Sequence, residues 1–586
     1  MKFLLTAVNA KYIHSNPAIY SLRAYAGREL QEHIELAEYT INHYMQDILA
    51  DIYRRRPDAI GFSCYIWNWN LIQDLLAELP KVLPDTDIWL GGPEVTYDAD
   101  VIMQKYPQIT GIMIGEGEVT FKEVLEAYVA GADWGTIPGL YLPDGYTPMR
   151  ELTDISKLPF LYEDMEPFAN RIIYYETSRG CPYRCSYCLS SIDKKVRLRD
   201  ISVVKRELQF FLDYKVPQVK FVDRTFNCNH DHAMAIWQYI HDHDNGVTNF
   251  HFEISADILR EDEIALLKSF RPGLAQLEIG VQSTNEQTIR AINRIMNVKR
   301  LEQIVASVQE GENIHQHLDL IAGLPYEDYE SFGHSFNRVY RMKPEQLQLG
   351  FLKVLKGSEM HERAQEFGIC YLEKPPYEVL HTKWLSYTEV LRLKRIEEMV
   401  ELYYNSNQYT HTLPFLLGAF ESPFAMYEAM ADFYERHGYF VNSPARAYRY
   451  HVLLKFAEEY DGVHSAVYRE LLTYDMYLRE NLKSRPDFAT DMSDRAIKET
   501  IRSFYQKEAE ERTYLPDYGA YDWKQLSKMT HLEPFHYPVW DVDALISMSV
   551  SGAMQSDGAG TSYILFDYKV RNPLNYEAKT QLIEIR

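Results

Sequence analysis

Short apolar runs alternate with amphipathic stretches through the first part of this 586-residue chain. The apolar, β-prone runs lie at residues 2–8, 59–64, 88–90 and 111–114. Between them, helix-like stretches begin at Pro17 and cover the regions around residues 44–55 and 70–83. Strands that alternate with helices form parallel sheets with helices on both faces. We therefore predict a doubly wound α/β domain over residues 1–135.

The same alternation resumes after a proline-containing stretch, residues 136–168, which we interpret as a linker. Strand signals separated by helices recur at residues 171–176, 218–222, 249–254, 274–280, 315–321 and 346–354. Six strand–helix units predict an open, partial (β/α)6 barrel over residues 169–370. In barrels, functional side chains gather at the carboxyl ends of the strands.

The last third, residues 371–586, changes to a mostly α-helical pattern with strands near its end. The sequence from Ser386 to Glu389 has the form of a capping box, and apolar residues follow it at helical spacing. Ser422-Pro423 and Ser443-Pro444 are each predicted to start a helix, with serine as the cap. Residues 563–568 and 581–585 are predicted strands, preceded by a glycine-rich turn at 552–560.

Composition and charge disfavour some classes of partner. Asp and Glu number 84 against 61 Lys and Arg, a formal net charge of −23. Such a surface repels phosphate backbones, so nucleic acid is an unlikely partner. No run of roughly 18 apolar residues occurs, so no membrane span is expected, and the first apolar run is too short for a signal peptide. Six sparse cysteines fit a reducing compartment. We expect a cytoplasmic protein.

Three cysteines carry the strongest chemical signal. Cys181, Cys185 and Cys188 are spaced C-x3-C-x2-C just after the first predicted barrel strand. Thiolates ligate iron–sulfur clusters, and three of them leave one iron of a four-iron cluster without a protein ligand. A structural zinc site would need a fourth ligand such as Cys228 or His230, and a disulfide framework would need more cysteines. Both alternatives are weaker.

This spacing, with an aromatic Tyr187 before the third cysteine, resembles the signature of the radical S-adenosylmethionine enzymes. The resemblance implies a 4Fe-4S cluster whose open iron chelates the amino and carboxylate groups of S-adenosyl-L-methionine. It also implies reductive cleavage of that cosubstrate to methionine and a 5′-deoxyadenosyl radical. Tyr183 and Tyr187, both inside the cysteine loop, are predicted to contact S-adenosylmethionine.

Polar residues near the ends of the later barrel strands extend the resemblance. The run from Leu277 to Ser283, followed by Ile292-Asn293-Arg294, looks like the fourth-strand motif of the branch that includes anaerobic coproporphyrinogen oxidase. The run from Asp319 to Pro325 matches the fifth strand of that branch. The resemblance implies S-adenosylmethionine contacts from Asp223, Glu253, Gln282, Arg294 and Asp319. For any one of them alone, a salt bridge or a hydrogen bond at the barrel rim is an equal alternative.

Three loops at predicted strand ends in the first domain point to a flat, bulky ligand, because glycine lets such a ligand approach the backbone closely. Together they resemble the Rossmann-like cobalamin-binding domain of the cobalamin-dependent radical S-adenosylmethionine enzymes. The predicted cobalamin contacts are Ser63, Cys64, Ile66, Trp67, Gly91, Gly92, Glu94, Gly115, Glu116 and Gly117.

The motif Asp-x-His-x-x-Gly, whose histidine ligates cobalt in other cobalamin proteins, is absent from the sequence. We therefore expect base-off cobalamin without a histidine ligand, its lower face capped by Ile66 or Trp67. His14, in the loop after the first predicted strand, is the alternative ligand.

Together these features predict a cobalamin-binding radical S-adenosylmethionine enzyme. The resemblance implies methylation of an unactivated carbon in a small or medium-sized substrate or a peptide, with flavodoxin or ferredoxin as electron donor. Radical cyclisation or rearrangement without methyl transfer is an alternative. An alternative of another class is a cobalamin- or redox-responsive binding protein. The sequence names neither the substrate nor a catalytic side chain.

Overall fold

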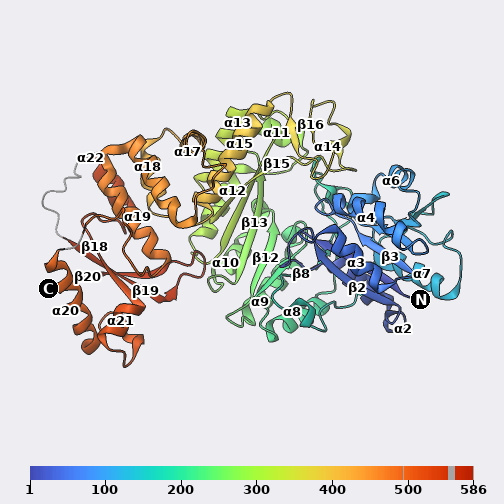
Figure 1. Cartoon of the computed structure of the whole chain (residues 1–586), viewed down its shortest axis with the longest axis horizontal. Coiled ribbons are helices and arrows are strands. Elements are labelled where there is room, and N and C mark those ends of the chain that lie inside the picture. Colours follow the sequence, from blue (N-terminus) through green and yellow to red (C-terminus); the bar gives the residue numbers. More distant parts are fainter. Residues whose placement is uncertain (492–493, 552–560, 585–586) are drawn as a thin grey trace. The chain divides into compact units, whose positions relative to one another are not determined.

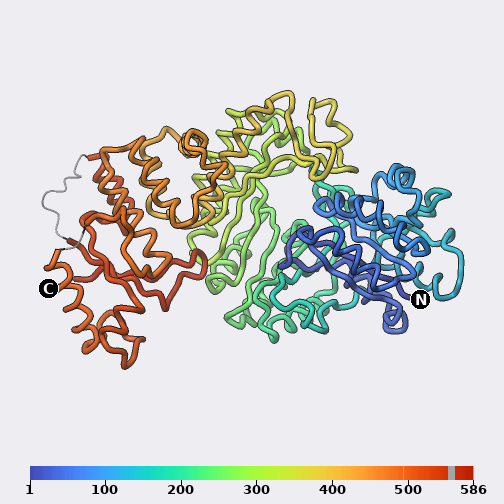
Figure 2. The backbone as a smooth tube through the Cα atoms, viewed as in Figure 1, coloured from blue at the N-terminus to red at the C-terminus, as the bar shows by residue number. Residues whose placement is uncertain are grey.

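The computed structural model of the chain describes residues 1–491, 494–551 and 561–584 (Figure 1). The predicted glycine-rich turn at residues 552–560 lies outside this range. The chain forms two compact units, whose backbone paths are drawn in Figure 2. The first unit comprises Met1–Ile314, Ile321–Asp328 and Gly350–Tyr387, and the second comprises His315–Leu320, Tyr329–Leu349 and Thr388–Arg586.

The first unit begins with a sheet of strand order β2-β1-β3-β4-β5-β6-β7. Five strands are parallel: β1 (Phe3–Asn9), β2 (Ile34–Thr40), β3 (Ala59–Ser63), β4 (Asp87–Gly91) and β5 (Gly111–Met113). Two antiparallel strands, β6 (Leu140–Leu142) and β7 (Gly145–Tyr146), extend the sheet into the stretch interpreted as a linker. The sequence pattern also missed β2, because this strand carries the polar residues Glu35 and Glu38 at the sheet edge.

Helices pack against the parallel sheet through buried apolar residues, as predicted (Figure 1). They are α1 (Pro17–Ala26), α2 (Arg28–Gln31), α3 (Met45–Arg55), α4 (Trp69–Val82), α5 (Pro93–Thr96), α6 (Ala99–Lys105) and α7 (Gly117–Ala130). Helix α1 starts where the sequence indicates, because the Asn16 side chain accepts a hydrogen bond from the Ile19 amide and Pro17 follows the cap.

The second sheet has the strand order β15-β14-β13-β12-β11-β8. Its strands are β8 (Ile173–Tyr175), β11 (Gln218–Phe221), β12 (Asn249–Ile254), β13 (Ala275–Gln282), β14 (His315–Ala322) and β15 (Gln346–Phe351). The pairs β8–β11, β11–β12 and β12–β13 are parallel. The intervening helices include α8 (Ile201–Asp213), α9 (His230–Asp242), α10 (Glu261–Lys268), α11 (Glu286–Ala291), α12 (Val298–Gln309) and α13 (Tyr329–Tyr340). The α/β partial barrel is confirmed.

A short antiparallel hairpin was not predicted. Its strands, β9 (Ser178–Arg179) and β10 (Arg197–Leu198), bracket the cysteine loop. After the barrel strands, the first unit continues through α14 (Glu359–Glu362), β16 (Cys370–Tyr371) and β17 (Val379–His381).

The second unit contains the predicted helices and a three-stranded antiparallel sheet. Its later helices are α15 (Tyr387–Met399), which begins at the unit boundary, α16 (Thr412–Leu416), α17 (Pro423–Arg436), α18 (Arg449–Asp461), α19 (Ser465–Arg479), α20 (Arg495–Glu511), α21 (Trp523–Met529) and α22 (Val542–Ser551). The sheet comprises β18 (Thr530–Phe535), β19 (Ser562–Arg571) and β20 (Ala578–Ile583). Ser422 caps α17 as predicted, whereas the predicted helix start at Ser443 is wrong, because helical structure begins at Arg446.

Among the described residues, no helix combines the length and apolar character needed to cross a lipid bilayer.

Candidate functional site

The three strand-end loops of the first domain, two of which contain glycine, meet at one edge of its sheet. Ser63 pairs with Gly91, and Gly91 pairs with Met113, so β3, β4 and β5 end side by side. Gly92 has a φ of +111°, and a Cβ there would lie 2.5 Å from the carbonyl oxygen of Cys64. Only glycine fits this close approach of two loops. The carboxyl edge of a parallel sheet is where ligands bind in this architecture.

Side chains of the first loop divide between core and surface. The Cys64 thiol is fully buried among apolar residues, and burial raises its pKa. The Cys64 side chain therefore packs in the core, and only the Cys64 backbone borders the site at the sheet edge. The Trp67 ring stacks on Tyr65 at a centroid distance of 4.4 Å, and its Nε1 donates to the carbonyl oxygen of Val8 at 3.1 Å. Trp67 is 43% exposed and Ile66 half-buried, so both border the loop edge.

Glu94 already has partners within the protein. Its carboxylate accepts a hydrogen bond from the Tyr377 hydroxyl and lies 3.8 Å from Lys356 Nζ. Burial raises the pKa of Glu94. Lys356 also pairs with Asp98 at 2.7 Å. Glu94 thus ties the first domain to the chain that follows the barrel, and its predicted cobalamin contact remains a prediction.

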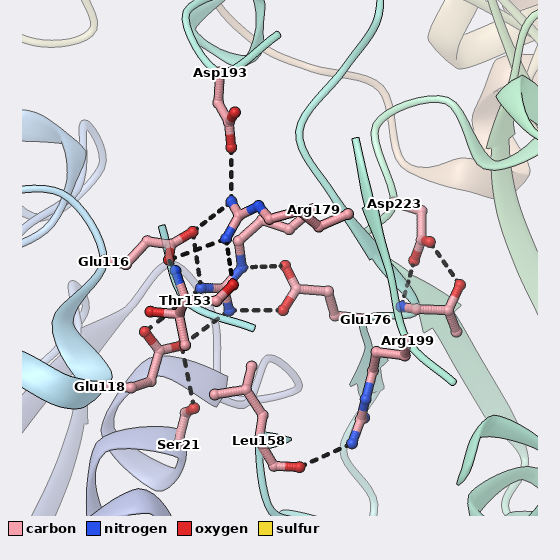
Figure 3. Close-up of polar contacts among 12 residues, drawn as sticks. Ser21, Glu116, Glu118, Thr153, Leu158, Glu176, Arg179, Asp193, Arg199 and Asp223 are labelled. Atoms are coloured by element: carbon pink, nitrogen blue, oxygen red, sulfur yellow. Dashed lines mark hydrogen bonds and ion pairs between the residues drawn. The ribbon is translucent and has the colours of Figure 1, made fainter. Parts of the chain in front are cut away.

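Glu116 joins three separate segments of the chain (Figure 3). Its Oε2 accepts from the Thr153 amide at 2.9 Å and from Arg197 Nη1 at 3.1 Å, while Oε1 accepts from Arg197 Nη2 at 2.6 Å. Arg179 Nη1 lies 3.3 Å from the same Oε1. Burial opposes ionisation here, but the hydrogen bond from Arg197 and the charge of Arg179 lower the pKa of Glu116 to about 2.

Arg179 completes this arrangement from the cysteine hairpin. Its Nη2 donates to Glu118 Oε1 at 2.9 Å and to Glu176 Oε2 at 2.8 Å (Figure 3). Burial disfavours the charged guanidinium, yet the carboxylates of Glu176 and Glu118 outweigh it and raise the pKa of Arg179. We call the set Glu116, Glu118, Glu176, Arg179, Asp193 and Arg197 the ion-pair network.

The cysteine loop is folded by its own backbone. Gly180 has a φ of +95°, and a Cβ there would lie 2.5 Å from the carbonyl oxygen of Lys195. The Cys181 amide donates to the Asp193 carbonyl at 3.0 Å, and the Cys188 amide donates to the Cys185 carbonyl at 3.1 Å. All three cysteines are free thiols, with Cys181 and Cys185 buried and Cys188 half-buried.

Arg294 lies beside the cysteine loop, and both Arg294 and Gln282 have a buried polar atom without a hydrogen-bond partner. Arg294 Nη1 lies 3.8 Å from Cys185 Sγ and 3.2 Å from the Tyr187 hydroxyl, while its Nη2 donates to the Gly280 carbonyl. Arg294 Nε and Gln282 Oε1 are buried without a hydrogen-bond partner. A buried polar atom of this kind can be satisfied by a bound polar ligand. The donor set therefore fits a cluster bound by three thiolates with a polar cosubstrate beside it.

The remaining predicted residues occupy different environments. Asp223 is fully buried, and its carboxylate accepts from the Thr177 amide at 2.9 Å and from the Thr177 hydroxyl at 2.6 Å. Glu253 is half-buried on β12, opposite Glu278 in register. The side chains of Tyr183 and Ser255 form a hydrogen bond. Asp319 belongs to the second unit, where its Oδ1 lies 3.0 Å from His317 Nε2. The S-adenosylmethionine contacts of these residues remain predictions.

Sequence reasoning missed a charged group on the barrel strands. Glu278 Oε2 lies 3.1 Å from Lys220 Nζ and 3.0 Å from His251 Nε2. Burial opposes its ionisation, but hydrogen bonding to His251 and the charge of Lys220 lower the pKa of Glu278 to about 2. Burial alternates without a break along β13, which places Glu278 on the same strand face as Gln276. This alternation of apolar and polar residues is visible in the sequence and could have identified the strand face that carries Glu278.

Family comparisons match three stretches of the chain. Residues 4–125 match the B12 binding domain, and residues 175–339 match the radical SAM superfamily. Residues 365–553 match a family described as protein of unknown function (DUF4080). The first two matches confirm the predicted pair of ligand-binding domains and the predicted fold class.

Curated relatives and solved structures agree with these matches. The cobalamin-dependent radical SAM methyltransferase TokK of Streptomyces tokunonensis is 24% identical over 361 residues, covering 54% of this chain and 51% of TokK. An uncharacterized methyltransferase of Pyrococcus horikoshii is 30% identical over 207 residues, covering 32% of this chain and 44% of the relative. Other relatives include anaerobic magnesium-protoporphyrin IX monomethyl ester cyclases. The chain spans about half the length of the curated relatives it matches.

The structure of OxsB, a cobalamin-dependent S-adenosylmethionine radical enzyme with aqua-cobalamin bound, superposes with a TM-score of 0.54 at 14% identity. The superposition covers 94% of this chain and 81% of OxsB. At this identity the likeness shows a shared fold.

Asp223 generates a prediction about pH. Burial raises the pKa of Asp223 from 3.8 to about 6. Asp223 therefore stabilises the folded state fully below pH 4, and this contribution is lost as the pH rises through 6. Asp223→Asn keeps the shape without the charge. We expect the fall in unfolding free energy between pH 4 and 7 to be smaller in the variant by about 2–3 kcal/mol.

Urea unfolding across this pH range measures the effect, and Asp74→Asn, at an exposed position on α4, is the control. An unchanged pH dependence in Asp223→Asn, matching that of the control, contradicts a raised pKa of the buried Asp223 carboxyl group.

Proposed function

We propose that this chain, which joins a B12-binding domain to a radical SAM domain, is a cobalamin-dependent radical S-adenosylmethionine enzyme. The observation that carries the proposal is the cysteine loop. Three free thiols lie in one loop, Arg294 lies beside Cys185, and Arg294 and Gln282 each have a buried polar atom without a partner. We also propose the domain limits 1–135, 169–370 and 371–586, with residues 136–168 connecting the first two.

The protein's own residues have distinct tasks in this proposal. Cys181, Cys185 and Cys188 ligate the 4Fe-4S cluster, and Arg294 presents its guanidinium toward Cys185. The unpartnered Nε of Arg294 and Oε1 of Gln282 bind the polar end of S-adenosylmethionine. When bound, these cofactors supply a one-electron cleavage that yields a carbon radical, and cobalamin supplies a methyl group.

Cobalamin binding is assigned to the carboxyl edge of the first sheet. Gly92 lets the loop after β4 lie directly against the Cys64 backbone, and a Cβ at Gly115 would meet no atom within 4 Å, so Gly115 leaves room for a ligand. Trp67 and Ile66 border this edge and can cover a flat ring. We also propose cobalamin contacts for the other residues of the same loops, namely Ser63, Cys64, Glu94, Glu116 and Gly117.

For the reaction we propose methyl transfer to an unactivated carbon of a small or medium-sized substrate or a peptide. Support comes from the relatives, which are named as methyltransferases more often than as cyclases. Flavodoxin or ferredoxin is the proposed electron donor. Sparse, unpaired cysteines support a cytoplasmic location.

The first test concerns the cluster. After anaerobic reconstitution with iron, sulfide and cobalamin, we expect the native protein to form 5′-deoxyadenosine from S-adenosylmethionine under a strong reductant. Cys185→Ala should lose this cleavage at least about a hundredfold, because one cluster ligand is gone. Cobalamin binding, measured by absorbance after gel filtration, should be retained.

Three outcomes separate the alternatives in that test. Unchanged cleavage in Cys185→Ala contradicts the cluster assignment. 5′-Deoxyadenosine without S-adenosylhomocysteine, in the presence of cell-extract substrates, favours cyclisation or rearrangement. Absence of any cleavage by native protein that holds both cofactors favours a binding protein.

The second test concerns the cobalt ligand. His14 Nδ1 lies 2.6 Å from the Tyr174 hydroxyl on β8, and the sequence lacks the usual ligand motif. We expect bound cobalamin to be base-off, with no nitrogen splitting in the electron paramagnetic resonance spectrum of the cob(II)alamin form. His14→Ala should give the same spectrum. Nitrogen splitting that disappears in His14→Ala would identify His14 as the ligand instead.

A further inference from the structure

One short segment, from Gly115 to Glu118, borders two sites. Gly115 and Gly117 are proposed to border cobalamin, whereas Glu116, between them, and Glu118, after them, point into the ion-pair network (Figure 3). Gly115 and Glu116 end the loop after β5, and Gly117 and Glu118 begin α7, so the four residues are consecutive and share one backbone path. A ligand that contacts the glycines therefore acts on the same backbone that carries the two carboxylates.

The opposite side of the network leads to the cysteines. Arg179 is the last residue of β9, and only Gly180 separates it from Cys181. Arg197, on β10, pairs with Asp193 at 2.7 Å, and the carbonyl of Asp193 accepts from the Cys181 amide at 3.0 Å. Both arginines are therefore fixed to the backbone that shapes the cysteine loop.

The contacts between the two sides are largely shielded from water. The Arg197 and Glu116 side chains are 10% and 17% exposed, and the Arg179 and Glu118 side chains are 21% and 8% exposed. Each arginine donates to more than one carboxylate, and its planar guanidinium fixes direction as well as charge. Shielded pairs of this kind keep their geometry at physiological salt.

We propose that Glu116 and Glu118 are positioning residues that couple cobalamin occupancy to the cysteine loop through Arg179 and Arg197. Cobalamin that contacts the segment from Gly115 to Glu118 holds the carboxylates in place, and these hold the hairpin that carries Cys181. This inference rests on the proposed function. Coupling between two sites is a free energy shared by both, so it is detectable at either of them.

The experiment measures iron release from the cluster to a chelator, with and without cobalamin. In the native protein we expect cobalamin to slow iron release by about fivefold or more, the lower end of usual coupling between sites. Glu118→Gln removes one charge of the network, and Arg179→Met removes its central cation. In both variants the ratio of the two rates should fall toward one.

Glu123→Gln is the matched control. Glu123 lies on the same helix as Glu118 and pairs with Arg150 at 3.3 Å, but that pair contacts neither arginine of the hairpin. This variant should keep the native ratio. If Arg179→Met fails to hold a cluster, Glu118→Gln decides alone.

The proposal is overturned if cobalamin does not slow iron release in the native protein, or if Glu118→Gln keeps the native ratio. The proposal is also overturned if the ratio of the two iron-release rates falls equally in Glu123→Gln, because the effect then reflects general destabilisation. Native protein that contains no iron after reconstitution contradicts the proposed function instead, so the two failures are distinguishable.

Discussion

The ion-pair network around Glu116 and Arg179 is the interaction on which the first unit depends. It brings the loop after β5, the segment at Thr153 and the cysteine hairpin to one place. Removing one partner of such a buried pair typically costs about 3–5 kcal/mol, because the other charge stays buried alone. The network therefore fixes where the cysteine loop lies relative to the edge of the first sheet.

Three further ion pairs, made by two cations, repeat the same charge pattern. Arg171, just before the first barrel strand, pairs with Glu38 on β2, and Lys356 pairs with Asp98 and Glu94. In each case the carboxylate belongs to the B12-binding domain and the cation to the chain that follows it. Charge complementarity thus joins two domains whose cofactors are proposed to act on one substrate, and such complementarity favours one arrangement over others.

Much of the fold was predictable because it depends on local sequence patterns. The alternation of strands and helices, the cap at Asn16 and the cysteine spacing are all visible within short windows. The edge strand β2 escaped because Glu35 and Glu38 interrupt its apolar pattern.

Partnerships between distant side chains could not be predicted. Glu94 contacts Tyr377, 283 residues further along the chain, and nothing near Glu94 in the sequence indicates this. The contact between Asp223 and Thr177, 46 residues earlier in the chain, was likewise not visible in the sequence. The cysteines were identified by chemistry, whereas the arginines that position their loop were identified only by the fold.

The central claim is that three thiolates bind a four-iron cluster with one iron open to S-adenosylmethionine. The most direct measurement is the electron paramagnetic resonance spectrum of the reduced, reconstituted protein, recorded with and without S-adenosylmethionine. We predict a reduced four-iron signal whose g values shift when the cosubstrate is added. A signal that is absent, or that is identical in both samples, would contradict the account.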